Sequence, residues 1–344
     1  MKRLAFDART IGDHYPGIGR YAFGVWQALG DRVTYSIIDP NLRNTRFEID
    51  GLTRESVSVR SPLAQIDLPL KLRDANIYYS PYFLMPYFVP CASVVTLYDA
   101  TPLYPLPAPS PIHKTNGGGI GWGFKLIFRL AHYLAGQAAN RVIVLSDSAK
   151  EEMIALGVPR QKMIVCPPGL DPKFHPREKA EIERIKIKYG LPDEFLLCFG
   201  SKKWHKNTDA LWEIRDWRLV VTGGGFNGIR NTQYVSHIDE SDLPSFYSSA
   251  SALIFPSLRE GFGLPIIEAM ACGTPVVCLP APGVKEAASD AAVMADDMTN
   301  AALAQAASRL RDPIFREEKR IAGLEWVKQF TWSKTVQTIL EVGG

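Results

Sequence analysis

Short apolar segments alternate with longer helix-like segments along most of the chain, and this alternation constrains the fold more than any other feature of the sequence. In the first half, segments rich in Val, Ile and Leu predict buried parallel strands at 3–7, 34–38, 93–97 and 141–145. Helix-like patterns lie at 21–29, 123–140 and 149–156. Strands that alternate with helices are typical of a doubly wound α/β domain with a parallel sheet.

The pattern stops at a Pro- and Gly-rich linker, Cys166 to Pro172, and then starts again. The second series predicts strands at 195–199, 218–222, 252–255 and 275–278, and helices at 243–249, 265–271, 299–310 and 314–328. A chain of 344 residues is long enough for two domains. We therefore expect an α/β protein of two Rossmann-like doubly wound domains, 1–168 and 173–325, that face a central cleft.

Composition excludes several classes of protein. With 46% hydrophobic and 22% charged residues, the chain is neither disordered nor a collagen or coiled coil. Its net charge of +3 does not indicate nucleic-acid binding. The charge is uneven, however, because residues 1–170 hold 18 Lys and Arg against 13 Asp and Glu. A basic first half suits a phosphate group or a membrane surface, although ordinary variation in surface charge explains it equally well.

The cysteines and the apolar stretches bear on where the chain works. The five cysteines are odd in number, far apart and mostly inside apolar segments, which predicts buried free thiols in a reducing compartment. Asp7 and Arg9 interrupt any signal-peptide core, and no stretch of 18 apolar residues is present. We expect a cytoplasmic protein, with peripheral contact to the inner membrane face as an open alternative.

Residues 102–133 hold two features that the strand–helix pattern does not explain. Five prolines in 102–111 and five glycines in 116–123 predict a long irregular segment, which is either an acceptor-side loop or an inert surface insertion. Aromatic and basic residues then follow at helical spacing: Trp122, Phe124, Lys125, Phe128, Arg129 and Tyr133. They fit either a membrane-facing amphipathic helix or a helix packed in the core.

The segment 256–277 carries the chemistry, because it runs from a strand end through a glycine loop into a helix. Gly261 and Gly263 allow the backbone to approach a ligand, and Pro265 suits the first turn of a helix. The start of that helix offers amide donors to a phosphate. Glu260 before the loop and Glu268 one turn into the helix can accept hydrogen bonds from hydroxyl groups. A ligand with a sugar, a diphosphate and a ribose would satisfy all of these groups.

This segment resembles the signature of the retaining glycosyltransferases of family 4, which have the GT-B fold and two glutamates separated by seven residues. The resemblance covers nearly the whole chain, since further landmarks follow in the family's order: 6–9 with 17–21, 142–148, Gly169 to Asp171, Gly200 with Lys206 and Asn207, 243–247, and 330–332. It implies that a C-terminal helix within 326–344 packs back on the first domain. It also implies a metal-independent hexosyltransferase that uses a nucleotide diphosphate sugar and no cofactor.

The family pattern assigns roles to matching residues. Glu260 would bind a hydroxyl of the donor sugar, and the backbone of Gly261, Phe262, Gly263 and Leu264 would contact sugar and phosphate. Glu268 would hold the ribose, and Lys206 with Asn207 would lie at the diphosphate. Gly17 and Gly19 would bring a glycine loop of the first domain to the leaving group.

Two positions depart from the family pattern. His205 stands where the family has Arg, so Lys202 or Lys203 would have to supply the missing charge, without the fork geometry of a guanidinium. Tyr98-Asp99 replaces a His-Asp pair, which makes Tyr98 a candidate near the sugar and Asp99 a candidate for orienting the acceptor. The helix after Asn207 is also expected to be short, because 218–222 already has the pattern of a strand.

Sugar transfer builds negative charge on the departing diphosphate, and Lys206 with the helix start near Leu264 can stabilise that charge without a metal ion. No Asp-x-Asp pair and no ligand-like spacing of histidines is present, so we expect no metal site. Retention of configuration follows from the resemblance alone. The resemblance favours a mannose-like hexose and a GDP-sugar over a UDP-sugar, with a glycan or polyprenyl-linked acceptor in the biosynthesis of cell-surface polysaccharide such as lipopolysaccharide.

Parts of the sequence also fit three other functions. A dehydrogenase is suggested by Gly17, Gly19 and Asp39, but the glycines lie about ten residues after their strand, too far for a dinucleotide fingerprint. A catalytically impaired GT-B scaffold or partner subunit is suggested by His205 and Tyr98, whereas the presence of Lys206 and both glutamates argues against it. A sugar phosphorylase or epimerase would share the fold.

Overall fold

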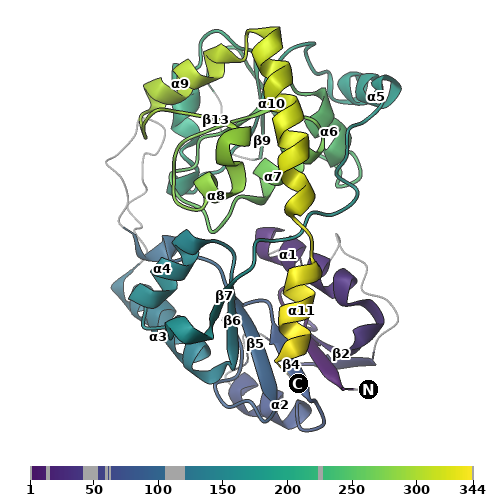
Figure 1. Ribbon diagram of the computed structural model, residues 1–344, viewed down its shortest axis with the longest axis vertical. Helices are drawn as coiled ribbons and strands as arrows, with labels where there is room; N and C mark the ends of the chain where they lie inside the picture. Colours follow the sequence, from purple (N-terminus) through teal and green to yellow (C-terminus); the bar gives the residue numbers. More distant parts are fainter. Residues whose placement is uncertain are drawn as a thin grey trace. The chain divides into compact units, whose positions relative to one another are not determined.

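Two compact units make up the chain. The computed structural model describes residues 2–12, 16–41, 53–58, 61, 63–104, 121–223 and 228–342 (Figure 1). Unit 1 comprises Met1–Pro102, Ile120–Gly169 and Phe330–Gly344, and unit 2 comprises Leu103–Gly119 and Leu170–Gln329. The domain bounds expected from the sequence, 1–168 with a C-terminal helix in 326–344, and 173–325, stay predictions.

Unit 1 is built on a seven-stranded sheet with the order β3-β2-β1-β4-β5-β6-β7. Its strands are β1 (Leu4–Asp7), β2 (Val33–Ile38), β3 (Thr53–Ser56), β4 (Ile77–Ser80), β5 (Ala92–Leu97), β6 (Arg141–Val144) and β7 (Met163–Val165). Its helices are α1 (Pro16–Leu29), α2 (Ala64–Lys71), α3 (Trp122–Ala138), α4 (Asp147–Ala155) and α11 (Ser333–Glu341). Short 3-10 turns lie at Gly30–Arg32, Thr101–Leu103 and Arg160–Lys162.

Unit 2 is built on a six-stranded sheet with the order β10-β9-β8-β11-β12-β13. Its strands are β8 (Leu196–Phe199), β9 (Leu219–Thr222), β10 (Thr232–Val235), β11 (Ala252–Phe255), β12 (Val276–Cys278) and β13 (Val293–Met294). Its helices are α5 (Lys179–Tyr189), α6 (Leu243–Ser249), α7 (Leu264–Ala271), α8 (Val284–Ala288), α9 (Asn300–Arg309) and α10 (Pro313–Trp326), with 3-10 turns at Trp204–Lys206, Thr208–Glu213, Ser289–Ala291 and Val327–Gln329.

Both sheets confirm the expected doubly wound α/β architecture. Every strand pair among the described residues is parallel, and in each sheet the strand order reverses once. All eight predicted strands are present. Five more were not predicted, because they are short or carry polar and tyrosine residues in place of Val, Ile and Leu: β3, β4, β7, β10 and β13.

Four of the five cysteines are buried. Cys166, Cys198, Cys272 and Cys278 are buried free thiols as expected, and Cys91 is half-buried. Burial raises the pKa of the Cys198 thiol to about 12, so this side chain stays protonated at neutral pH. The Pro- and Gly-rich segments predicted at 102–111 and 116–123 lie mostly outside the described residues.

The glycine loop expected at Gly17 and Gly19 is instead the start of a helix, and their proposed place at the leaving group stays a prediction. The backbone is already helical from Pro16, so both glycines lie in the first turns of α1. A Cβ on Gly19 would lie 3.1 Å from the backbone oxygen of Thr10, which follows β1, whereas a Cβ on Gly17 would have nothing within 4 Å. Gly19 therefore serves the close approach of α1 to the segment after β1.

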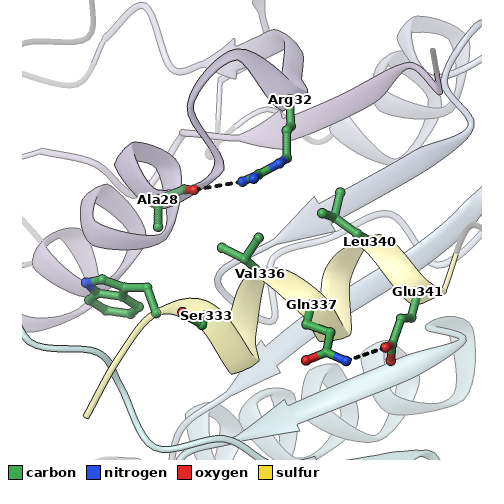
Figure 2. Close-up of a pocket in the computed structure, with 8 residues that line it drawn as sticks. Ala28, Arg32, Ser333, Val336, Gln337, Leu340 and Glu341 are labelled. Atoms are coloured by element: carbon green, nitrogen blue, oxygen red, sulfur yellow. Dashed lines mark hydrogen bonds between the residues drawn. The ribbon is translucent and has the colours of Figure 1, made fainter. Parts of the chain in front are cut away.

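Helix α11 belongs to unit 1 and packs against α1 (Figure 1). Trp332, which immediately precedes α11, fills the space left by two glycines, since a Cβ on Gly24 or on Gly169 would overlap its side chain. Its ring also meets Tyr21 edge-on, with 5.4 Å between centroids. Beside this contact lies an open cavity of about 610 Å³ between α1 and α11, and none of the predicted site residues lines it (Figure 2).

The packing of Trp332 can be tested by replacing Gly24 with alanine. We expect Gly24→Ala to lower the free energy of unfolding by about 1–3 kcal/mol, because the added methyl group has to displace the indole ring. Gly123→Ala is the matched control, since it also lies in a helix but has open space around the new Cβ; it should leave stability unchanged or raise it by up to about 1 kcal/mol. Denaturant unfolding followed by tryptophan fluorescence measures both, and equal effects would contradict the packing argument.

Candidate functional site

The reversal of strand order in unit 2 lies between β8 and β11. The chain leaves these two neighbouring strands toward opposite sides of the sheet, so a crevice opens at their carboxyl ends, where ligands bind in folds of this kind. The segment 200–207 follows β8 and holds the 3-10 turn Trp204–Lys206. The segment 256–263 follows β11 and leads into α7. The predicted lysine and glutamate segments therefore flank the same crevice.

The two segments are tied together by direct contacts. The backbone N–H of Leu258 donates to the carbonyl oxygen of His205 at 2.7 Å. The Lys206 Nζ donates to Glu260 Oε1 at 2.6 Å, and both side chains keep some exposure, 26% for Lys206 and 13% for Glu260. The ammonium also lies 5.5 Å from the centroid of the Phe255 ring. The structure thus brings together the two residues for which the sequence predicted the central roles.

A third segment, after β12, fixes the backbone of Glu260. The Glu260 N–H donates to the carbonyl oxygen of Pro282 at 3.2 Å. Gly283 follows with a positive φ of 75°, and any Cβ there would overlap the backbone oxygen of Glu260. Gly283 was not predicted as part of the site. The sequence did hold a signal for it: Gly283 follows a predicted strand and two prolines, Pro280 and Pro282. It therefore lies at the carboxyl end of a strand, the edge of the sheet where ligands bind.

The start of α7 has the expected features of an anion-binding helix end. Gly263 adopts a φ of 106°, which only glycine reaches without strain, and Pro265 lies in the first turn. No side chain caps the helix start. Gly261, Phe262 and Gly263 are buried and Leu264 is half-buried. These features leave the positive end of the helix dipole to be complemented by a ligand.

Glu268 has surroundings quite different from those of Glu260. The residue is 2% exposed, and its carboxylate accepts a hydrogen bond from the Tyr247 hydroxyl at 2.9 Å. A buried carboxylate without hydrogen bonds costs several kcal/mol, so this contact stabilises the charge and joins α6 to α7. Tyr247 was not predicted, because a tyrosine in a short apolar helix carries no signal of a polar partner.

The remaining predicted residues of unit 2 lie around the turn after β8. Lys202 and Lys203 are exposed. Asn207 adopts the left-handed conformation, with a φ of 44°, and its side-chain amide donates to Asn300 Oδ1 at 3.0 Å. This contact fixes the turn against the start of α9. The helix after Asn207 is indeed short, a single 3-10 segment at Thr208–Glu213.

Tyr98 and Asp99 follow β5 in unit 1, and both are occupied by local contacts. The Tyr98 hydroxyl donates to the carbonyl oxygen of Pro81 at 2.8 Å, and burial holds its pKa well above the ordinary value. The Asp99 carboxylate accepts from the backbone N–H of Thr101 at 2.8 Å. Tyr98 therefore remains a neutral hydrogen-bond donor at physiological pH, and the roles of both residues stay predictions.

A buried ionic cluster in unit 1 was missed by sequence reasoning. Arg9 and Asp7, both nearly inaccessible, pair at 2.7 Å, and the Tyr78 hydroxyl donates to the same carboxylate at 2.6 Å. Burial opposes the charge of Arg9, but the attraction of Asp7 outweighs it, so the pKa of Arg9 lies above its ordinary value. Arg9 also donates to the carbonyl oxygen of Leu84. The cluster ties the segments after β1 and β4, where the strand order of unit 1 reverses.

Among the described residues, no group of three or more His, Cys, Asp or Glu side chains could hold a metal ion.

Comparison with known proteins gives a consistent class for this fold and site. The family described as "Glycosyl transferases group 1" matches residues 198–312, which hold Lys206 and both glutamates. The O-antigen chain mannosyltransferase B of Escherichia coli is 29% identical over 299 residues, which is 78% of this chain and 74% of that protein.

Two solved structures share the fold over nearly their whole length. A crystal structure of Anabaena HepE in complex with UDP and glucose superposes with a TM-score of 0.74 at 17% identity, covering 99% of both chains. WaaG, a glycosyltransferase involved in lipopolysaccharide biosynthesis, superposes with a TM-score of 0.67 at 17% identity, covering 98% of this chain and 99% of that chain.

The fold and the family match define a glycosyltransferase with the GT-B fold. More particularly, the chain belongs to the group 1 glycosyltransferases, family 4. The resemblance drawn from the glutamate motif is confirmed.

The role of Gly283 gives a prediction for the site. Gly283→Ala should destabilise the protein by about 1–3 kcal/mol more than Gly190→Ala and should lower transfer activity at least about tenfold, because its Cβ overlaps the Glu260 backbone. Gly190 is the matched control: it also has a positive φ, 62°, but the nearest atom to a new Cβ is 3.9 Å away. Thermal unfolding and a sugar-transfer assay measure the two effects. Equal losses in both variants would show that Gly283 matters only for its backbone angle.

Proposed function

We propose that this glycosyltransferase moves a mannose-like hexose from a nucleotide diphosphate sugar, GDP-mannose being favoured, to a glycan or polyprenyl-linked acceptor in cell-surface polysaccharide biosynthesis. The observation that carries the donor class is the Lys206–Glu260 pair beside the uncapped start of α7. Mannose is supported by the likeness to the O-antigen mannosyltransferase, and a polysaccharide role also by WaaG. The HepE complex holds UDP, so a UDP-sugar is the competing donor.

The geometry of the pair allows both residues to bind the donor without separating. A lysine ammonium has three N–H donors, of which Glu260 takes one, so two remain for diphosphate oxygens. The second oxygen of Glu260 can accept a hydrogen bond from a sugar hydroxyl. The ion pair thus orients Lys206 toward the phosphates and Glu260 toward the sugar.

The proposed chemistry follows from this arrangement. Cleavage of the bond between the anomeric carbon and the diphosphate oxygen builds negative charge on the departing phosphate. Lys206 and the start of α7 stabilise that charge, with Lys202 or Lys203 adding to the positive potential from the exposed turn. No metal ion is needed for this stabilisation. The family resemblance adds that the anomeric configuration is retained.

The role of Lys206 can be tested by nucleotide titration. Lys206→Met keeps the length of the side chain but removes its charge, so we expect affinity for the favoured nucleoside diphosphate to fall about 10- to 100-fold, as for the loss of one charge-assisted hydrogen bond. Lys285→Met removes an exposed lysine from α8 and is the control. Calorimetry with GDP, UDP, ADP and dTDP also identifies the base.

Unchanged affinity in Lys206→Met would remove the diphosphate role. No binding of any of the four nucleotides to the natural chain would instead favour the alternative, a catalytically impaired GT-B scaffold.

The two glutamates should separate binding from turnover. Glu260→Gln is expected to lower kcat by at least about tenfold, because its partner on the donor is the sugar. Nucleotide affinity should change little, since the amide oxygen of Gln still accepts a hydrogen bond from Lys206. Glu268→Gln keeps an acceptor for Tyr247 but loses the charge proposed to hold the ribose, so nucleotide affinity should fall.

Tyr247→Phe serves as the control, since it removes the internal partner of Glu268 and leaves the carboxylate in place. If Tyr247→Phe and Glu268→Gln lower thermal stability alike while nucleotide affinity stays unchanged in both, Glu268 acts only in packing α6 against α7.

A further inference from the structure

The reversal of strand order in unit 1 lies between β1 and β4, which are parallel neighbours. The segments that follow these two strands therefore meet at the carboxyl edge of the sheet, where ligands bind in doubly wound folds. Arg9 and Thr10 follow β1 directly at this edge. Neither residue has a role in the chemistry proposed for the Lys206–Glu260 pair, which belongs to unit 2.

Arg9 is firmly held but does not use all of its hydrogen-bond donors. Its Nε donates to Asp7 Oδ1 at 2.8 Å, and its Nη2 donates both to Asp7 Oδ2 at 2.7 Å and to the carbonyl oxygen of Leu84. These contacts use three of the five N–H groups of a guanidinium. Within the part of the chain that the structure describes, the two N–H groups on Nη1 have no hydrogen-bond partner.

The Asp7 carboxylate fixes the direction of these unused N–H groups. Besides the side chain of Arg9, it accepts hydrogen bonds from the backbone N–H of Arg9 at 3.2 Å and from the Tyr78 hydroxyl at 2.6 Å. Four hydrogen bonds fill the acceptor positions of a carboxylate, so Asp7 itself has no capacity left for a ligand. Because a guanidinium is planar and rigid, fixing Nε and Nη2 also fixes Nη1 before any ligand arrives.

Thr10, the next residue, holds a second unused polar group. It is 3% exposed, and its Oγ1 is buried without a hydrogen-bond partner among the described residues. A buried hydroxyl without a partner lowers the stability of the folded protein and needs an explanation. Two adjacent, nearly inaccessible residues at the ligand-binding edge thus hold hydrogen-bonding groups that the fold does not use.

The chemistry of these groups indicates which class of ligand satisfies them. Asp7 cancels the charge of Arg9, so the pair attracts an anion far less than a lone guanidinium does. Nη1 can only donate, whereas the Thr10 hydroxyl can donate and accept. A sugar hydroxyl, which also donates and accepts, complements both groups, but a phosphate oxygen can only accept.

We propose that Arg9 Nη1 and Thr10 Oγ1 bind hydroxyl groups of a sugar residue in the acceptor. Arg9 and Thr10 are then determinants of acceptor specificity, and they select a saccharide over a polyprenyl phosphate that carries no sugar. The proposal rests on the proposed function, because it describes the acceptor of the same transfer reaction.

Ligand-observed NMR tests the proposal with the full-length chain and no nucleotide. The saccharide probes are methyl α-mannopyranoside and α-mannobiose, and the anionic probe is farnesyl phosphate. We expect both saccharides to bind, and Arg9→Lys to weaken their binding about tenfold or more. Lysine can keep the ion pair with Asp7, but it lacks the second terminal nitrogen of the fork. A purely structural role of Arg9 would be restored by lysine.

Thr10→Val is the second variant, since it replaces the hydroxyl by a methyl group of similar size. Removing an unpartnered hydroxyl should raise thermal stability, while the lost ligand contact should weaken saccharide binding about tenfold. Ser36→Ala is the matched control. The Ser36 hydroxyl is also buried without a partner among the described residues, but Ser36 lies inside β2 and not at the edge of the sheet. Its saccharide binding should equal that of the natural chain.

Two results would overturn the proposal. One is failure of both saccharides to bind the natural chain, or unchanged saccharide binding in Arg9→Lys and Thr10→Val. The other is binding of farnesyl phosphate that Arg9→Lys abolishes, because this would define an anion site.

Nucleotide affinity, measured by calorimetry, separates this proposal from the proposed function. It should be the same in Arg9→Lys and Thr10→Val as in the natural chain, because Lys206 and Glu260 belong to unit 2. The proposed function fails only if the natural chain binds no nucleotide, whatever the saccharide probes show.

Discussion

The reversal of strand order between β8 and β11 is the constraint on which the site depends. Because β8 and β11 are parallel neighbours, the segments that follow them meet at one edge of the sheet before the chain turns to opposite sides. A glycine from a neighbouring segment packs against the backbone of each of these segments and leaves no room for a Cβ. Gly223 packs on the backbone oxygen of Gly200 after β8, and Gly283 packs on the backbone oxygen of Glu260 after β11. The position of one carboxylate thus rests on glycines in neighbouring segments, not on the glutamate motif alone.

The strands predicted from the sequence are mostly apolar runs, whereas all four edge strands and β4, the middle strand of the seven-stranded sheet with the sequence IYYS, were missed. Strands such as β11 and β12 are buried on both faces and are therefore continuous runs of apolar residues. Edge strands such as β3, with the sequence TRES, need only pair on one side and carry no such run. Gly19 suggested a loop for a related reason. Glycine signals a close approach of the backbone, but a helix packed on a neighbouring segment needs that approach as much as a ligand loop does.

Residue types and spacing predicted the members of the candidate site but not their contacts. The spacing of Glu260 and Glu268 indicated the family and assigned the two carboxylates to different ends of one ligand, but it did not indicate their partners within the protein. The structure gives them different partners: an ammonium for Glu260 at the crevice, and a tyrosine hydroxyl for Glu268 in the interior between α6 and α7. A pattern along the chain cannot reveal Lys206 as the partner of Glu260, because 54 residues separate them and only the order of the strands brings them together.

The same limit explains why helix α3 could be interpreted in two ways from its sequence. Its residues are apolar around most of the helix, and periodicity alone does not say which face the sheet covers. The tertiary contacts decide the question: Phe83 seals one face over Phe128 and His132, and burial lowers the pKa of His132 to about 4, so this side chain adds no charge to the helix. Lys125 and Arg129 are then the only charged side chains on α3. The core side of α3 is therefore neutral and aromatic, and its outer side is apolar with cations alone.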